Sequence, residues 1–179
     1  MYLSYGNQAI RPATVDDAPT LCRWWNDGGV MAHAGFPMGL GTTPEKVAAQ
    51  IRAQNILHQR LMLEVDGITV GEMSYRVTGQ AAEIGIKICD ACQREKGYGT
   101  RFLIMLIGYL FGKMGVERIV LDTNLNNARA QHVYEKIGFV RQGVRVDAWA
   151  DQLGVPQSVA DYQLEKCDFA RRYPLENGG

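Results

Sequence analysis

The stretch Arg94-Glu95-Lys96-Gly97-Tyr98-Gly99 stands between an expected strand at residues 82–88 and an expected helix at residues 97–114. The first turn of a helix presents backbone N–H groups without intrahelical partners and a partial positive charge. Two glycines would let a phosphate group approach these N–H groups, and the cations of Arg94 and Lys96 would strengthen the attraction. This context predicts a pyrophosphate site, although a short glycine pair before a helix also serves ordinary turn geometry.

One alternative is a dinucleotide-binding loop, which requires a third glycine where this chain has Phe102. An acid does end the next expected strand, at Asp122, in the position of a ribose-binding carboxylate. The missing glycine and the antiparallel character of the three preceding strands argue against this alternative.

A second array follows one strand later, and it reads Asn127-Ala128-Arg129-Ala130-Gln131-His132-Val133-Tyr134-Glu135-Lys136-Ile137-Gly138-Phe139. With the glycine loop it forms two motifs, Arg94-x-x-Gly97-x-Gly99 and Asn127-x-x-Ala130-x-x-x-Tyr134-x-x-x-Gly138-Phe139. The two motifs and their spacing resemble the signatures of the GNAT acetyltransferase superfamily. The motif-bearing resemblance covers about residues 82–139, whereas the flanking segments agree only in the order of their elements.

The resemblance implies that the chain is an acetyl-CoA-dependent N-acetyltransferase. Backbone N–H groups of residues 94–100 would hold the pyrophosphate, and the side chain of Asn127 would contact the pantetheine arm. Ala130 shares a helix face with Tyr134 and, being small, would leave room for the cofactor. The cofactor-binding residues expected on this basis are Ile88, Arg94, Glu95, Lys96, Gly97, Tyr98, Gly99, Thr100, Asn127 and Ala130.

The expected catalytic residue is Tyr134, whose phenol the resemblance places near the thioester sulfur. A phenol has a reference pKa near 10, so it can donate a proton to a departing thiolate. A core tyrosine packed behind Phe139 is the alternative for the same residue.

An alkylamine is almost wholly protonated near neutral pH, and freeing it costs roughly 4 kcal/mol. Glu83 is the expected general base because it begins the strand before the glycine loop, where some family members carry such an acid. Alternation along that strand would turn Glu83 away from the isoleucines at positions 84, 86 and 88. Glu72 on the adjoining strand is a rival, and ordered water without a dedicated base is a third alternative.

The acceptor is less defined than the donor. In this family the acceptor site is built from the first helices, the loop between them and the final hairpin. The residues expected to bind the acceptor are Trp25, Asp27, Glu72 and Asp147. The layout is similar to the ribosomal-protein, polyamine and aminoglycoside acetyltransferase-like branches, and we favour a small-molecule amine over a protein N-terminus. A non-catalytic acyl-CoA-binding module is the alternative outside the enzymes.

The hydrophobic patterns predict a mixed α+β fold, in which a mostly antiparallel sheet carries helices on both faces. Residues 28–42, rich in glycine, are expected to form a long loop without regular structure. We expect one acetyltransferase domain over residues 1–179, with a core at about residues 9–168 and a tail at residues 169–179. The predicted helices cover residues 14–26, 43–55, 97–114 and 127–136. The predicted strands cover residues 9–12, 61–65, 68–77, 82–88, 118–122, 139–148 and 158–166.

The composition argues against several other classes. The 19 Lys and Arg residues balance the 19 Asp and Glu residues, so no nucleic-acid partner is expected. Residues 102–111 are the longest apolar stretch, about half of the ~20 residues that a membrane span needs. With no signal peptide evident, a cytoplasmic location is the default. Cys89 and Cys92 lack the companions of a zinc site, so we expect reduced cysteines and no metal. The resemblance also makes a homodimer an expectation.

Overall fold

The computed structural model describes residues 1–174, and an eight-stranded sheet lies at its centre. The strand order is β1-β2-β3-β4-β5-β6-β8-β7, and only the β5–β6 pair is parallel. The strands are β1 (Leu3–Tyr5), β2 (Gln8–Pro12), β3 (His58–Val65), β4 (Ile68–Thr78), β5 (Ala81–Ile88), β6 (Arg118–Asn124), β7 (Val140–Ala150) and β8 (Pro156–Glu165). The expected mixed, mostly antiparallel sheet is confirmed.

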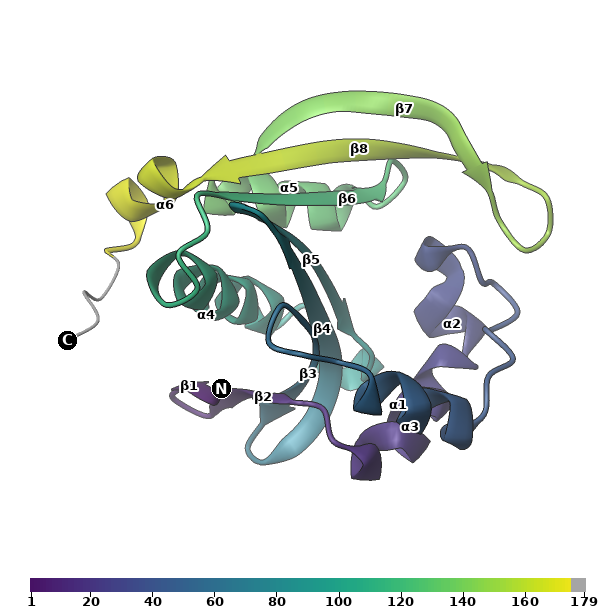
Figure 1. The fold of residues 1–179 in the computed structure, drawn as a ribbon. Coiled ribbons are helices and arrows are strands. Elements are labelled where there is room, and N and C mark those ends of the chain that lie inside the picture. The colour runs from purple at the N-terminus through teal and green to yellow at the C-terminus, as the bar shows by residue number, and fades with distance from the viewer. Residues whose placement is uncertain (175–179) are drawn as a thin grey trace.

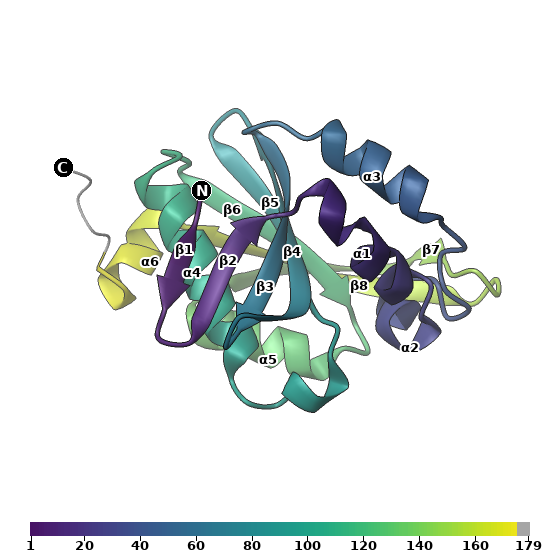
Figure 2. The same ribbon diagram turned by 90° about the horizontal axis from the view of Figure 1, so that it is seen from below.

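Helices cover both faces of this sheet, as expected (Figures 1 and 2). They are α1 (Ala18–Trp25), α2 (Gly28–Met31), α3 (Pro44–Arg52), α4 (Tyr98–Gly112), α5 (Ala128–Ile137) and α6 (Lys166–Arg172). One hydrophobic cluster joins α4, α5 and α6 to the sheet, and a second joins α1 and α3 to its other face. In α4 the buried Phe102, Leu106 and Leu110 recur every four residues, which places them on one helical face.

Three expectations about the elements need correction. Residues 28–42 are not without regular structure, because the Asp27 carboxylate accepts a hydrogen bond from the backbone of Gly29 at 2.7 Å and starts α2. A strand at residues 3–5 precedes the expected first strand and pairs with β2. Residues 169–172, expected to belong to a tail, are part of helix α6 instead. Phe169 is buried there, and its ring centroid lies 5.5 Å from that of Phe111. Residues 175–179 of that tail lie outside the described residues.

The parallel pair opens the sheet. β5 and β6 are paired only at residues 81–83 and 118–120, yet β5 continues to Ile88 and β6 continues to Asn124. Each strand keeps its outer neighbour over that length, since Ile88 still pairs with Gly71 and Asn124 still pairs with Val159. The two strands therefore diverge into a V, visible in Figure 1, whose inner edges present backbone N–H and C=O groups.

The turn between β7 and β8 is fastened to the segment that follows α2. The Gln152 side chain accepts from the backbone N–H of Met38 and donates to the carbonyl of Gly39, each at 3.0 Å. Its own backbone N–H donates to the carbonyl of Gly35 at 2.9 Å. These bonds join the segment that follows α2 to the last hairpin.

Among the described residues, none of the helices combines the length and apolar character that crossing a membrane requires.

Candidate functional site

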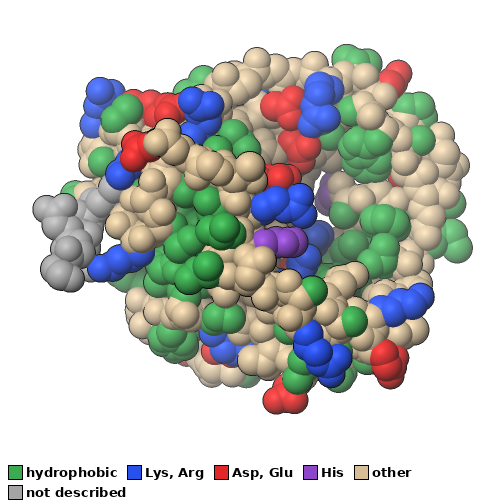
Figure 3. All heavy atoms as spheres, viewed as in Figure 1, with side chains coloured by type: hydrophobic (Ala, Val, Ile, Leu, Met, Phe, Trp, Pro, Cys, Tyr) green, Lys and Arg blue, Asp and Glu red, His purple; other side chains and the backbone are tan. Residues whose placement is uncertain are grey.

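The V between β5 and β6 opens into a cavity of about 1100 Å³. One end is lined by the close of β5, the glycine loop and the start of α5, and the other end by α2 and β7. Figure 3 shows this side of the molecule hollowed, with acidic, basic and histidine side chains gathered around the hollow. The cavity thus passes through the sheet at the point where the strands separate.

Most of the residues expected to bind the cofactor line this cavity. They are Ile88, Arg94, Glu95, Gly97, Tyr98, Gly99, Thr100, Asn127 and Ala130. Lys96 is the exception, because its exposed ammonium group is turned to the side-chain oxygen of Gln93 at 3.1 Å. The two motifs, far apart in the chain, therefore meet at one end of the cavity.

The glycine loop is held in a defined shape. The Arg94 guanidinium donates to the carbonyl of Ile88 at 3.0 Å and to that of Cys89 at 3.4 Å, so it anchors the loop to β5 and is not a mobile cation. Gly97 precedes α4 with φ of +78°, a conformation that favours glycine. A Cβ on Gly99 would lie 3.9 Å from Ile88 and 4.0 Å from Ile86, so a side chain at this position would point to the β5 wall of the cavity.

The start of α5 faces this loop. Asn127 caps the helix by accepting a hydrogen bond from the backbone of Ala130 at 3.2 Å, and its amide nitrogen bonds to none of the described residues. The Arg129 guanidinium forms an ion pair with Glu95 across the mouth of the cavity. Arg129 has no role in the sequence-based prediction, although its place two residues after Asn127 in the motif was available as a signal.

Tyr134 combines the two roles that its sequence allowed. Its ring packs against Phe139 at 5.8 Å and Tyr162 at 5.9 Å, and only 6% of the residue is exposed. The residue also lines the cavity, and none of the described residues forms a hydrogen bond with its hydroxyl. Burial, followed by the negative charge of Asp122, raises the pKa of Tyr134 to about 12. The phenol is therefore protonated and faces the cavity at neutral pH.

The two carboxylates considered as bases lie in different surroundings. Glu83 is exposed beside the paired end of β5, across from Arg76 and Val120, and does not line the cavity. The alternation is as expected, since Ile84 packs in the core while Glu83 faces away. Because the cavity begins only beyond this paired end, the geometry does not support Glu83 as the base.

Glu72 is buried and fully engaged. Its carboxylate accepts from the Trp25 indole at 2.8 Å, from Lys87 at 3.4 Å and from Arg60. Burial opposes its ionisation, but the charges of Arg60 and Lys87 and the hydrogen bonds outweigh burial and lower the pKa of Glu72. A carboxylate of lowered pKa with three donors is a poor proton acceptor. The geometry therefore makes Glu72 a holder of cations and not a base.

A different acid, Asp122, lines the cavity. It stands at the open end of β6, and its carboxylate accepts from Arg145 at 2.8 Å. Arg145 also binds Asp161 through two hydrogen bonds of 2.8 Å, which keeps it aligned. Sequence reasoning considered Asp122 only as a ribose-binding mimic. The signal that it missed was strand divergence, which exposes a carboxylate at this point.

The other residues expected to bind an acceptor are scattered. Trp25 is buried with its ring face against the Arg60 guanidinium at 4.6 Å, which occupies that face. Asp27 caps α2 and Asp147 lies on the exposed β7 with φ of +48°, and neither lines the cavity. Trp149 does line it, packed so closely on Gly35 that a Cβ there would approach the ring to 2.6 Å.

Metal chemistry has no evident ligand set in the part of the chain that the structure describes. No group of three or more His, Cys, Asp or Glu side chains there is arranged to hold an ion. The Cys89 thiol is buried, and burial raises its pKa to about 12, whereas Cys92 is exposed. The titratable side chains that line the cavity include the phenol of Tyr134, the carboxylates of Glu95 and Asp122, the imidazole of His33 and the ammonium group of Lys87.

Comparison with known proteins identifies a family. A family model described as an acetyltransferase (GNAT) domain matches residues 9–140. Over 56 residues the chain is 41% identical to an aminoglycoside N(6')-acetyltransferase type 1 of Klebsiella pneumoniae. The matched stretch covers 31% of this chain and 28% of that protein. The chain matches only 28% to 52% of the length of such curated relatives.

Solved structures resemble the chain over nearly its whole length. The spermidine N-acetyltransferase of Vibrio cholerae, in complex with CoA and spermine, is 18% identical with a TM-score of 0.82, covering 91% of this chain and 98% of that one. A ribosomal L7/L12 alpha-N-protein acetyltransferase in complex with coenzyme A is 16% identical with a TM-score of 0.80, covering 92% and 98%. At these identities the likeness shows a shared fold.

Proposed function

The chain belongs to the GNAT acetyltransferase family, and on that premise we propose that it transfers an acetyl group from acetyl-CoA to a primary amine. The observation that carries the proposal is the pairing of a protonated phenol, Tyr134, with a carboxylate, Asp122, in one cavity below a glycine loop. The first group can give a proton and the second can receive one. In an amide-forming transfer the amine loses a proton and the departing thiolate takes one up.

The residues present fit acetyl-CoA as the donor. Gly97 and Gly99 leave the start of α4 open to a pyrophosphate, and Arg129 adds a cation at the cavity mouth. The inner edges of β5 and β6 offer backbone groups to the amides of the pantetheine arm, together with the amide nitrogen of Asn127. Solved structures of the same fold that contain coenzyme A support this assignment.

The reaction divides between two side chains. Bound acetyl-CoA supplies a thioester, whose C–S bond breaks as the amine nitrogen forms a C–N bond to the acetyl carbon. Tyr134 donates its proton to the departing thiolate, and the phenolate regains a proton from water before the next turnover. Asp122 binds the cationic amine and receives its proton, directly or through water. Arg145 positions the Asp122 carboxylate.

The acceptor that we favour is a small-molecule amine. Its end of the cavity is walled by Trp149, and the hydrogen bonds of Gln152 fasten the β7–β8 turn over it. A walled end suits a small amine better than a protein N-terminus, although the likeness to the ribosomal-protein enzyme keeps that acceptor as the alternative. The partial match to an aminoglycoside enzyme and the likeness to a spermidine enzyme also support a small amine.

A thiol-release assay tests this proposal. The protein is given acetyl-CoA with polyamines, aminoglycosides, amino acids or N-terminal peptides, and thiol and acetylated amine are both measured. We expect amine-dependent thiol release in equal amounts with acetylated product for a small amine. Binding of acetyl-CoA with no thiol release for any class would instead identify a non-catalytic acyl-CoA-binding module.

A further inference from the structure

A second cavity, of about 240 Å³, lies on the same face of the sheet as the acceptor end of the first. We call it the Arg60 pocket, and it is lined by Trp25, Gln50, Gln54, His58, Arg60 and Ser74, among others. Ser74 on β4 pairs with Gly85 on β5, which lines the large cavity, and a Cβ on Gly85 would lie 3.4 Å from the Ser74 hydroxyl. One strand spacing therefore separates the two cavities.

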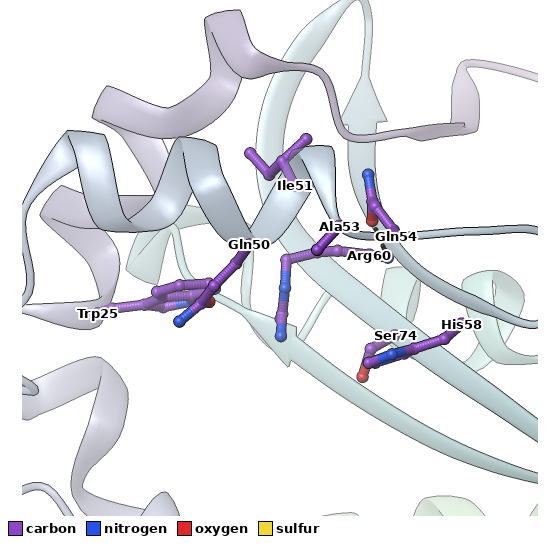
Figure 4. A pocket seen from close by; sticks show the side chains of 8 residues that line it. All are labelled: Trp25, Gln50, Ile51, Ala53, Gln54, His58, Arg60 and Ser74. Carbon is purple, nitrogen blue, oxygen red and sulfur yellow. Dashed lines mark hydrogen bonds between the residues drawn. The ribbon is translucent and has the colours of Figure 1, made fainter.

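Arg60 is set to present its guanidinium to this pocket. Figure 4 shows it reaching between Trp25 on one side and Ser74 and His58 on the other. Its Cζ lies over the Trp25 ring, 4.6 Å from the ring centroid, and one of its nitrogens is paired with Glu72. The remaining guanidinium donors form no hydrogen bond to the described residues, and 29% of the side chain is exposed. A fixed guanidinium with free donors is suited to bind a carboxylate through two hydrogen bonds.

The charges around Glu72 do not balance. The single carboxylate of Glu72 is shared by two cations, Arg60 from the side of the small pocket and Lys87 from the side of the large cavity. One positive charge is therefore in excess where the two cavities adjoin. A singly charged anion would match this excess better than a phosphate with two charges. At the far wall Asp122 offers the opposite charge.

We propose that the Arg60 pocket is a subsite for a carboxylate of the acceptor, so that the acceptor is an amine that also carries a carboxylate. The amine would face Asp122 while its carboxylate meets Arg60, with Lys87 between them. Arg60 on β3 and Asp122 on β6 are three strand spacings of about 4.8 Å apart, or about 14 Å. With a hydrogen bond of about 3 Å at each end, an acceptor with its two charged groups about 8 Å apart would span that distance. This inference rests on the proposed acetyl transfer and specifies its substrate class.

Three acceptors of matched length test the subsite. They are ε-aminocaproate, its uncharged analogue ε-aminocaproamide, and the diamine cadaverine. We expect kcat/KM to be about 10-fold higher for ε-aminocaproate than for the amide, because one charge-assisted contact is gained. Arg60→Gln should remove that preference by raising KM for the carboxylate alone, and Arg60→Lys should restore part of it. Arg76→Gln is the control, because it removes an exposed arginine of β4 that does not line the pocket.

A binding measurement without acetyl-CoA separates the subsite from catalysis. The Trp25 indole N–H donates to Glu72 beside Arg60, so its NMR resonance should shift when ε-aminocaproate is added. The resonance should not shift when the amide is added, nor when ε-aminocaproate is added to Arg60→Gln. Equal kcat/KM for carboxylate and amide, a preference that survives Arg60→Gln, higher kcat/KM for cadaverine, or an unshifted Trp25 resonance would each overturn the subsite. Absence of turnover with every amine would overturn the proposed function itself, whereas a Trp25 shift would still establish the pocket.

Discussion

The two ends of the large cavity are built in different ways. The donor end is formed by backbone: a glycine loop, the first turns of α4 and α5, and two diverging strand edges, all within residues 84–134. The acceptor end is formed by side chains from distant elements, with Val30 on α2, Trp149 on β7 and Asp122 on β6. Backbone geometry can be written as a short motif, whereas a side-chain arrangement depends on which strands lie side by side. The sequence of the donor end therefore identifies the family, whereas the side chains of the acceptor end determine which substrate is bound.

The largest expected effect comes from closing the donor end. Gly99→Glu should weaken acetyl-CoA binding more than about 1000-fold, because a carboxylate beside a phosphate costs several kcal/mol and 1.4 kcal/mol is about tenfold. Isothermal titration calorimetry checks this. Gly108→Glu is the control, because it adds the same charge to α4 where no heavy atom lies within 4 Å of a Cβ. Unchanged affinity in a folded Gly99→Glu protein would refute the assignment of this loop.

The second largest effect concerns Tyr134, which lies between the two ends of the cavity, and it separates acetyl-CoA binding from the chemical step. Tyr134→Phe should lower kcat roughly 300-fold while changing the dissociation constant of acetyl-CoA little, because only the proton donor is lost. Tyr162→Phe is matched to it, since Tyr162 packs against Tyr134 but its hydroxyl bonds to Glu135 at 2.9 Å. Similar turnover of Tyr134→Phe and wild type would remove the phenol from the mechanism.

At the acceptor end, Asp122→Asn should lower kcat/KM for a cationic amine by about 100-fold, because the variant neither attracts nor deprotonates it. The loss should shrink as the pH rises toward the pKa of the amine, where free amine becomes available. A pH–rate profile measures it, with Asp161→Asn as the partner variant because Asp161 binds the same Arg145. A pH–rate profile identical to that of wild type would show that Asp122 is not the base and that the amine loses its proton to water.

The smallest effect concerns stability beneath the acceptor end. Glu72→Gln should lower the free energy of unfolding by about 2 kcal/mol, less than for a fully buried pair because Arg60 and Lys87 are partly exposed. Folding lowers the pKa of Glu72 from its ordinary value near 4.5, so its carboxylate stabilises the fold above that pH. That stabilisation is lost as the pH falls through the lower pKa of the folded state.

Urea unfolding measures the free energy of unfolding of wild type and of Glu72→Gln near neutral pH and in acid. We expect the difference between the two proteins to be smaller in acid. Glu64→Gln, which breaks the ion pair of 2.7 Å with Arg11, should cost less than about 1 kcal/mol. A difference for Glu72→Gln that is independent of pH would mean that the buried carboxylate does not act through its charge.

The same contrast explains what could be predicted from the sequence. The glycine loop, the Asn127 array and the alternating strands have local periodicity, and the structure bears out the fold class. The α2 helix was missed because a single carboxylate, that of Asp27, starts it among glycines. Glu83 was expected as the base, with Glu72 as its rival, and Asp122 was not considered for that role, because strand alternation gives the face of a side chain but not the point at which two strands separate. That separation depends on the pairing of residues 81–83 with residues 118–120, which no local pattern encodes.

The central claim is that the V between β5 and β6 holds the donor, and hydrogen exchange with and without coenzyme A tests it most directly. We predict slower exchange of backbone amides in residues 84–103 and 122–134 when coenzyme A is bound, with β1, β2 and β7 unchanged. Protection that is confined to α1 and α2, or absent from residues 94–100, would contradict the account.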